Sequence, residues 1–295
     1  MIVSASYRTD IPAYWGRWFA RRLAEGAAVV RNPYGGRDYI VSLRREDVDG
    51  FVFWTKNAAP FAGVLAAVAA KGFPFVVQYT ATGYPAALEA AAPGAARSVA
   101  EMKRLRGAFG PRAVVWRYDP VVETSLTPPA WHRENFTRLA CALRGTVDEV
   151  VVSFAHPYAK TRRGLDAAAP AHGFSWRDPA AAEKRALAGD LAAIAAEQRM
   201  RLTLCSQPDL LPEGAEGAAC IDARRLSDVA GREIAARRKG NRPGCLCAES
   251  RDIGAYDTCP MGCAYCYAVG SRDRARRAVE TGTMDPTRRA RAAAR

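Results

Sequence analysis

The sequence predicts an α/β fold: a single TIM-like (β/α) barrel or partial barrel, followed by a cysteine-rich segment. Short apolar runs rich in Val, Phe or Tyr alternate with longer Ala-rich or amphipathic runs, as expected for parallel strands joined by helices. The chain has 295 residues, 49% of them hydrophobic, which is enough for one large core. A doubly wound open sheet is the competing fold, but no Gly-rich dinucleotide fingerprint follows the first apolar run.

The elements follow one another in a regular order. Six apolar runs predict strands, at residues 2–6, 51–55, 75–80, 113–118, 149–154 and 201–206. Five intervening runs predict helices, at residues 15–25, 59–71, 95–109, 129–143 and 179–198. Gly or Pro marks several junctions, for example Gly72 and Gly145. Residues 39–43 predict a further strand inside the first connection.

The alternation weakens after Cys205, and this divides the chain into three parts. We expect residues 1–210 to form the barrel core and residues 211–272 to form a cysteine-rich segment packed on the barrel mouth. Residues 273–295 are basic and contain little core material, so a mobile tail is expected there.

Polar side chains follow the predicted strands at the points where they end. In a parallel barrel these ends converge on one face, where barrel enzymes place their active sites. Arg8, Lys56 and Arg117 are expected to clamp carboxylate or phosphate groups. The further candidates at strand ends are Asp10, Thr55, Gln78, Tyr79 and Asp119. Structural ion pairs between neighbouring strand ends are the alternative explanation for the charged residues.

Six of the eight cysteines lie between residues 220 and 266. No basic segment leads into an apolar stretch at the N-terminus, and no apolar run approaches the roughly 18–20 residues that span a bilayer, so we expect a cytoplasmic protein without a membrane partner. In a reducing compartment, clustered cysteines are more often metal ligands or redox groups than disulfides. Cys141, in an amphipathic helix, is expected to be a buried apolar residue.

Cys259, Cys263 and Cys266 form a C-x3-C-x2-C run. Three thiolates at this spacing can bind three corners of a [4Fe-4S] cluster and leave the fourth iron open. Gly262 permits a tight backbone, and the aromatic Tyr265 precedes the last cysteine. The alternative is zinc, which usually takes four ligands. A second set of thiols is a candidate for a second cluster or a zinc ion: Cys205, Cys220, Cys245 and Cys247.

The C-x3-C-x2-C run resembles the cluster loop of the radical S-adenosylmethionine superfamily, although there it normally lies near the N-terminus. The resemblance implies a radical enzyme with a relocated, permuted loop, and S-adenosylmethionine bound at the open iron. It implies cofactor contacts from Thr55, Gln78 and Tyr265, and ribose or amine contacts from Asp10 and Asp119. Tyr79 is expected to donate a proton or hydrogen atom. A flavodoxin or ferredoxin would supply the electron.

Four motifs resemble the prokaryotic family known as domain of unknown function 1848. They are SYRTDIP at residues 6–12, FWTKN at 53–57, WRYDP at 116–120 and DIGAYDTC at 252–259. Met261 stands where that family's loop commonly has His. The resemblance implies that the second set of four cysteines belongs to the family pattern, but it implies no particular reaction.

The net charge of +13 leaves two further functions open. An anionic partner would make the chain an iron–sulfur protein of nucleic-acid repair, modification or binding. Trp15 and Trp18 are then candidate surfaces for stacking bases. The last alternative is a zinc-stabilised binding protein without catalysis. The substrate, a small molecule or a nucleic acid, is not specified by the sequence.

Overall fold

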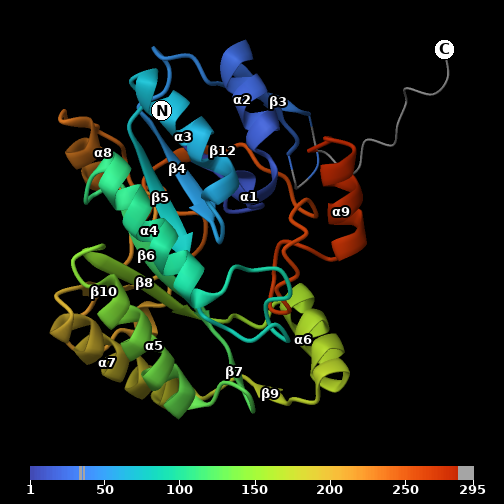
Figure 1. The fold of residues 1–295 in the computed structure, drawn as a ribbon, viewed down its shortest axis with the longest axis vertical. Coiled ribbons are helices and arrows are strands. Elements are labelled where there is room, and N and C mark those ends of the chain that lie inside the picture. Colours follow the sequence, from blue (N-terminus) through green and yellow to red (C-terminus); the bar gives the residue numbers. More distant parts are fainter. Residues whose placement is uncertain (33–34, 36, 285–295) are drawn as a thin grey trace.

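One sheet of eight parallel strands organises the protein (Figure 1). The computed structural model describes residues 1–32, 35 and 37–284. The strands are β1 (Ile2–Ala5), β4 (Gly50–Thr55), β5 (Phe75–Thr80), β6 (Val114–Val121), β8 (Glu149–Phe154), β10 (Arg201–Leu204), β11 (Glu216–Gly217) and β12 (Ser250–Asp252). Their order is β11-β10-β8-β6-β5-β4-β1-β12, and every neighbouring pair is parallel. The predicted α/β fold is confirmed.

The two edges of this sheet are β11 and β12. The strand order is that of a sheet that closes when its two edges pair, because the late strand β12 lies beside the first strand, β1. Within the described residues β11 and β12 do not pair, so the predicted closure into a barrel is not observed. Both strands are short, with two and three residues, and offer little backbone for a closing ladder.

A layer of helices covers one face of the sheet, and in Figure 1 α4 crosses in front of it. The helices of this layer are α2 (Gly16–Glu25), α3 (Ala62–Ala70), α4 (Ala95–Phe109), α5 (Pro129–Leu143) and α7 (Ala181–Glu197), with short turns α1 (Ile11–Tyr14), η1 (Ala59–Phe61) and η2 (Pro208–Leu210). Phe51, Phe53 and Phe75 point into the main hydrophobic core beneath these helices. The period-2 alternation of strands sends the intervening residues to the opposite face.

We call that opposite face the α8 face, after α8 (Ala223–Ala230). Val52, Val76 and Val115 form a second hydrophobic cluster there, together with Leu226 of α8. The approach is close at Gly50, where a Cβ atom would lie 3.0 Å from a Leu226 methyl carbon. Gln78 and Arg117 follow Val76 and Val115 by two residues, so the alternation places them on this face as well.

The remaining elements lie in the connections. They are β2 (Ala27–Val30), β3 (Tyr39–Ser42), β7 (Glu123–Thr124), β9 (Trp176–Arg177), α6 (Ala159–His172) and α9 (Arg272–Glu280). α6 contains Gly164 and Pro170, both poor helix formers, and the sequence pattern did not indicate it. α9 falls where a mobile tail was expected; its Ala275 and Ala278 are buried, while residues 285–295 lie outside the described residues.

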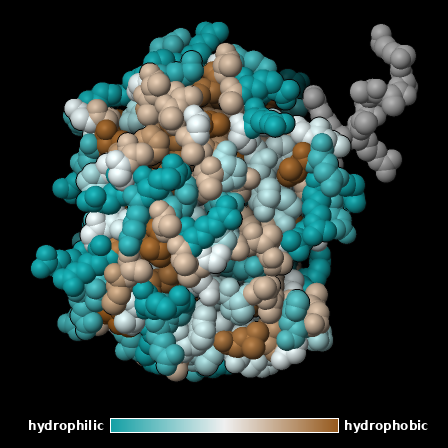
Figure 2. Space-filling model, viewed as in Figure 1, coloured by the Kyte–Doolittle hydropathy of each residue, from teal (hydrophilic) through white to brown (hydrophobic). Residues whose placement is uncertain are grey.

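The surface in this view is largely hydrophilic. Figure 2 shows hydrophilic side chains over α9 and around the periphery, with apolar residues in small groups between them. Among the described residues, no helix is both long and apolar enough to cross a membrane.

Candidate functional site

The C-x3-C-x2-C loop lies at the carboxyl ends of β1, β4 and β5. Its entry is fixed by the indole N–H of Trp15, which donates to the carbonyl oxygen of Thr258 over 3.0 Å. Its centre is fixed by an antiparallel bridge between Cys263 and Glu89, a residue of the segment that follows β5. The loop therefore lies against the edge of the sheet where the sequence predicted an active site.

Two glycines make this position sterically feasible. Gly262 has φ of +78°, and a Cβ atom there would lie 2.7 Å from the guanidinium carbon of Arg272. Gly164 of α6 is the second, since its Cβ atom would lie 2.1 Å from the carbonyl oxygen of Ala264. Figure 1 shows the chain before α9 passing beside α6. α6 thus packs directly against the backbone of the C-x3-C-x2-C loop.

The three thiols of the loop are half-buried and close enough to influence one another electrostatically. Burial raises the pKa of Cys259 to about 12, with further contributions from Asp10 and Cys266. Burial also raises the pKa of Cys263 and Cys266. Metal ligands must be deprotonated, so a metal that bound these thiols would displace their protons.

Within the described residues, no group of three or more His, Cys, Asp or Glu side chains stands in an arrangement that could hold a metal ion. The donor chemistry nevertheless fits an iron–sulfur cluster, because iron–sulfur clusters are held by cysteine thiolates. Backbone N–H groups also point at the sulfurs: that of Met261 at Cys259, and that of Ala268 at Cys266. Such bonds favour the thiolate.

A buried ion pair lies beside the loop. The Lys56 ammonium is 2.8 Å from the Glu89 carboxylate, which also accepts from Thr82 over 2.6 Å and from the Tyr265 hydroxyl. Burial lowers the pKa of Lys56, but the charges of Glu89 and Cys263 raise it above its ordinary value overall. Lys56 is therefore a fixed cation next to the thiols, and Tyr265 is tied to its partner.

Asp10 connects the end of β1 to the end of β4. Its carboxylate accepts from the backbone N–H of Lys56 over 2.8 Å and from that of Ala13 over 2.9 Å. The Thr55 side chain is a further hydrogen-bond partner. Burial raises the pKa of Asp10 to about 6, despite these hydrogen bonds. The structure thus brings Asp10, Thr55 and Lys56 together with the cysteine loop, as the sequence predicted.

Arg8 pairs with an acidic residue on the last strand. Its Nε lies 3.7 Å from Asp252, whose carboxylate also accepts from the hydroxyls of Ser4 and Ser6 at 2.8 Å each. The Arg8 guanidinium stacks 5.4 Å from the ring of Tyr7. This is the structural ion pair that was the alternative to a substrate clamp.

Arg117 lies on the α8 face and pairs with Asp119 at 2.5 Å. Asp119 in turn accepts from the Ser153 hydroxyl. Arg117 also donates to Gln78 over 3.3 Å and to the sulfur of Cys220 over 2.9 Å. Gln78 and Arg117 therefore contact the second set of cysteines rather than the C-x3-C-x2-C loop.

That second set forms one continuous group, which we call the inner thiol group: Cys205, Cys220, Cys245 and Cys247. The sulfurs of Cys205 and Cys220 are 3.5 Å apart. Cys247 is hydrogen-bonded to both Cys220 and Cys245, and its bond holds the pKa of Cys245 at about 6. Four cysteines from separated parts of the sequence thus meet on the α8 face.

Some expected site residues lie elsewhere. Tyr79 points away from its neighbour Gln78, into the main core under α4, where burial raises its pKa. Trp15 is buried and offers no stacking surface, and Trp18 is partly buried against the main core. Cys141 is exposed, contrary to the expectation for its helix.

Sequence reasoning missed Glu89, which anchors both Lys56 and Tyr265. Glu89 lies in an irregular Ala- and Gly-containing stretch with no periodic pattern, so nothing in the sequence indicated its position. The contact of Arg242 with the inner thiol group, 3.4 Å from the Cys205 sulfur, was missed for the same reason.

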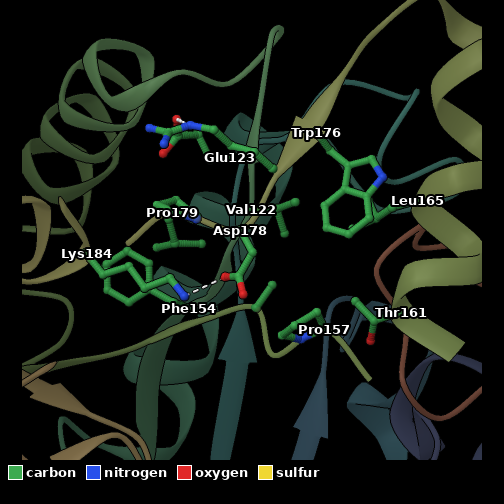
Figure 3. Close-up of a pocket in the computed structure, with 13 residues that line it drawn as sticks. Val122, Glu123, Phe154, Pro157, Thr161, Leu165, Trp176, Asp178, Pro179 and Lys184 are labelled. Atoms are coloured by element: carbon green, nitrogen blue, oxygen red, sulfur yellow. Dashed lines mark hydrogen bonds and ion pairs between the residues drawn. The ribbon is translucent and has the colours of Figure 1, made fainter. Parts of the chain in front are cut away.

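A small pocket between β7, β9 and α6 is separate from these residues (Figure 3). Val122, Phe154 and Leu165 line it, and the ion pair of Asp178 with Lys184 lies at one side. Its volume of about 20 Å³ is the space of roughly one water molecule. It is too small to be a substrate site.

Comparison with curated proteins gives no match, and comparison with solved structures also gives none. The family described as domain of unknown function (DUF1848) matches residues 2–268. The match covers the sheet, the inner thiol group and the whole C-x3-C-x2-C loop. The resemblance indicated by the four sequence motifs is confirmed, and the chain belongs to the DUF1848 family.

Proposed function

We propose that the protein is an iron–sulfur enzyme of the radical S-adenosylmethionine type, with a [4Fe-4S] cluster held by Cys259, Cys263 and Cys266. The observation that carries the proposal is the position of this loop. Three thiols of one loop lie at the carboxyl ends of parallel strands, beside the buried pair of Lys56 and Glu89. In α/β proteins this edge is where active sites are found.

We further propose that the eight-stranded sheet is a partial barrel. Its strand order supports this. From β1 to β11 the strands lie side by side in chain order, and the last strand, β12, lies on the other side of β1, as it would in a closed barrel. The relocated loop would then cover the mouth of a barrel from its C-terminal side. A permuted arrangement of this kind explains why the cluster loop comes last in the chain.

When bound, the cluster would supply one-electron transfer and an iron without a protein ligand, at which S-adenosylmethionine can bind. The protein's own residues would set the surroundings. Lys56 holds a positive charge next to Cys263, which offsets the negative charge of cluster thiolates. Glu89 and Tyr265 keep Lys56 in place and exclude water from that side.

The other residues at the mouth have assignable tasks. Asp10, with a pKa of about 6, can take up or release a proton near neutral pH at its carboxylate. Arg8 and Arg117 are already paired with Asp252 and Asp119, so an anionic substrate would have to compete for them. We therefore assign Arg8 to shaping the mouth and Arg117 to the contact with Cys220, rather than either to clamping substrate.

The iron assignment is tested by anaerobic purification and reconstitution, followed by iron and sulfide analysis of the wild type and of Cys263→Ala. We expect about four irons per chain at this site in the wild type and loss of them in the variant. The exposed Cys141→Ala is the matched control and should retain its iron. Full iron in Cys263→Ala would refute the cluster.

The assignment of S-adenosylmethionine has its own test. Addition of S-adenosylmethionine to the reduced protein should change the electron paramagnetic resonance spectrum, and deoxyadenosine should form. A protein with full iron content but an unchanged spectrum and no deoxyadenosine would disprove the radical chemistry and leave the cluster intact. For the nucleic-acid alternative, which stays a prediction, the buried Trp15 offers no stacking surface.

A further inference from the structure

The inner thiol group is not used by the function proposed above. Its members come from three places: Cys205 follows β10, Cys220 follows β11, and Cys245 with Cys247 precedes β12. The backbone N–H of Ile221 donates to the Cys247 sulfur over 3.3 Å. Cys205, Cys220 and Cys247 are all buried. Four thiols brought together by separate elements form a full ligand set for one metal site.

The spacing of the sulfurs distinguishes a single ion from a cluster. Zn–S bonds of about 2.3 Å at tetrahedral angles place neighbouring sulfurs about 3.8 Å apart. The sulfurs of Cys205 and Cys220 are 3.5 Å apart, close to that value. The ligands of a [4Fe-4S] cluster lie farther apart, because each is bonded to a different iron. This one spacing matches a site for a single ion, although among the described residues the four thiols do not stand in a coordination shell in their present rotamers.

The charges around the group fit a tetrathiolate. Arg117 donates to the Cys220 sulfur over 2.9 Å, a short distance typical of a charge-assisted bond. Arg242 donates to the Cys205 sulfur over 3.4 Å. A zinc ion with four thiolates carries a net charge of −2. The guanidinium of Arg242 and that of Arg117, which Asp119 already neutralises in part, lie against the sulfurs where this charge would be.

The loop that carries Cys245 and Cys247 has few buried side chains of its own to stabilise it. Most side chains of residues 232–246 are exposed, so little apolar burial holds this segment in place. The loop is nevertheless tightly folded at Gly240, where a Cβ atom would lie 2.4 Å from the carbonyl oxygen of Cys245. Structural zinc sites stabilise loops of this kind, which have little core of their own.

We propose that Cys205, Cys220, Cys245 and Cys247 bind one structural zinc ion. The contacts run in a chain from Cys205 through Cys220 and Cys247 to Cys245, so all four thiols belong to one connected group. Zinc binding would tie the end of β10 to the loop before β12. This site is independent of the cluster proposed for the C-x3-C-x2-C loop.

The test is metal analysis of the full chain purified without added iron. We expect one zinc per chain in the wild type, in Cys141→Ser and in Cys263→Ala, and its loss in Cys220→Ser and in Cys247→Ser. Zinc that remained in both of these last variants, or iron in place of zinc in the wild type, would overturn the proposal. Zinc retained in Cys263→Ala, the variant that loses iron on reconstitution, separates this site from the cluster.

A second measurement covers the case in which the serine variants do not fold. The wild type stripped with a chelator is titrated with Co²⁺, which gives intense visible absorption when four thiolates bind it tetrahedrally. We expect saturation at one Co²⁺ per chain and competition by an equal amount of Zn²⁺. Protease cleavage within residues 232–246 should be faster in the stripped protein and return to the starting rate with Zn²⁺. Absence of the absorption would overturn the site.

Discussion

At the scale of the residue, burial and a single neighbour decide what a titratable group does. His132 is fully buried in α5, where its Nδ1 lies 2.9 Å from the Tyr118 hydroxyl and its Nε2 lies 3.1 Å from the Val122 carbonyl oxygen. Burial lowers the pKa of His132 to about 4. The folded protein therefore keeps this imidazole neutral at pH values where the unfolded chain binds a proton.

This predicts a pH dependence of stability. Between pH 6.5 and pH 4 the unfolded chain holds more protons at His132 than the folded protein does, so stability falls as the pH falls through this window. A shift of this size corresponds to about 3 kcal/mol. Urea unfolding at several pH values should show that His132→Gln loses this much less stability than the wild type between pH 7 and pH 4. Equal slopes for the two proteins would contradict the assignment.

The predictability of single residues depended on whether they follow a regular strand. Arg117 and Asp119 follow the alternation of β6, so their place at a polar edge could be predicted. The same alternation predicts that Gln78 and Tyr79 face opposite sides, yet Tyr79 was assigned to the site because it ends a strand. Contacts across loops, such as that of Glu89 with Lys56, depend on tertiary packing and leave no pattern in the sequence.

At the scale of the element, the sequence predicted the strands and helices that fill the main core and missed those held by few contacts. β12 consists of Ser, Arg and Asp, which do not favour a strand, and it is extended because its backbone pairs with the edge of β1. α6 has buried Thr161 and Leu165, but its Gly and Pro residues hide the helical pattern. Propensity is a weak guide wherever a neighbour decides the structure.

The contact of α6 with the cysteine loop leads to a second prediction. Gly164→Ala adds a methyl group that would meet the Ala264 carbonyl oxygen, so we expect a loss of at least 1 kcal/mol in stability despite the better helix propensity of Ala. Gly107→Ala in α4 is the matched control, since no atom lies within 4 Å of its Cβ position. It should gain up to about 1 kcal/mol. Thermal unfolding should show a lower melting temperature for Gly164→Ala and an equal or higher one for Gly107→Ala; a Gly164→Ala protein as stable as the wild type would contradict the contact.

At the scale of the whole molecule, the α8 face is closed by a buried ionic contact. Arg225 of α8 is 1% exposed and pairs with Asp148 at 2.9 Å and with the buried Glu149 at 2.7 Å. These carboxylates lie where β8 begins, at the end of the sheet opposite the cysteine loop. The contact joins a late helix to a central strand, and composition and spacing do not indicate such a partner.

Removal of this contact should lower the free energy of unfolding of the whole protein. Arg225→Ala removes the buried counter-charge of Glu149 and leaves it only the exposed Arg201, 3.3 Å away, which predicts a loss of about 1–3 kcal/mol in the free energy of unfolding. Arg224→Ala changes the exposed neighbour on the same helix and should alter stability by less than about 0.5 kcal/mol. Urea denaturation compares the two. If they lost equal stability, the buried pair would not be what holds α8.

The pairing of β12 with β1 has a consequence for biosynthesis. β1 is made first, but one of its hydrogen-bonding edges stays open until residues 250–252 have left the ribosome. At translation rates of about 5–20 residues per second, this delay is on the order of 10–50 seconds. Throughout that time the nascent chain presents an unpaired strand edge to other chains. The cysteines follow immediately afterwards, so metal delivery to the C-x3-C-x2-C loop comes last, on a sheet that is otherwise assembled.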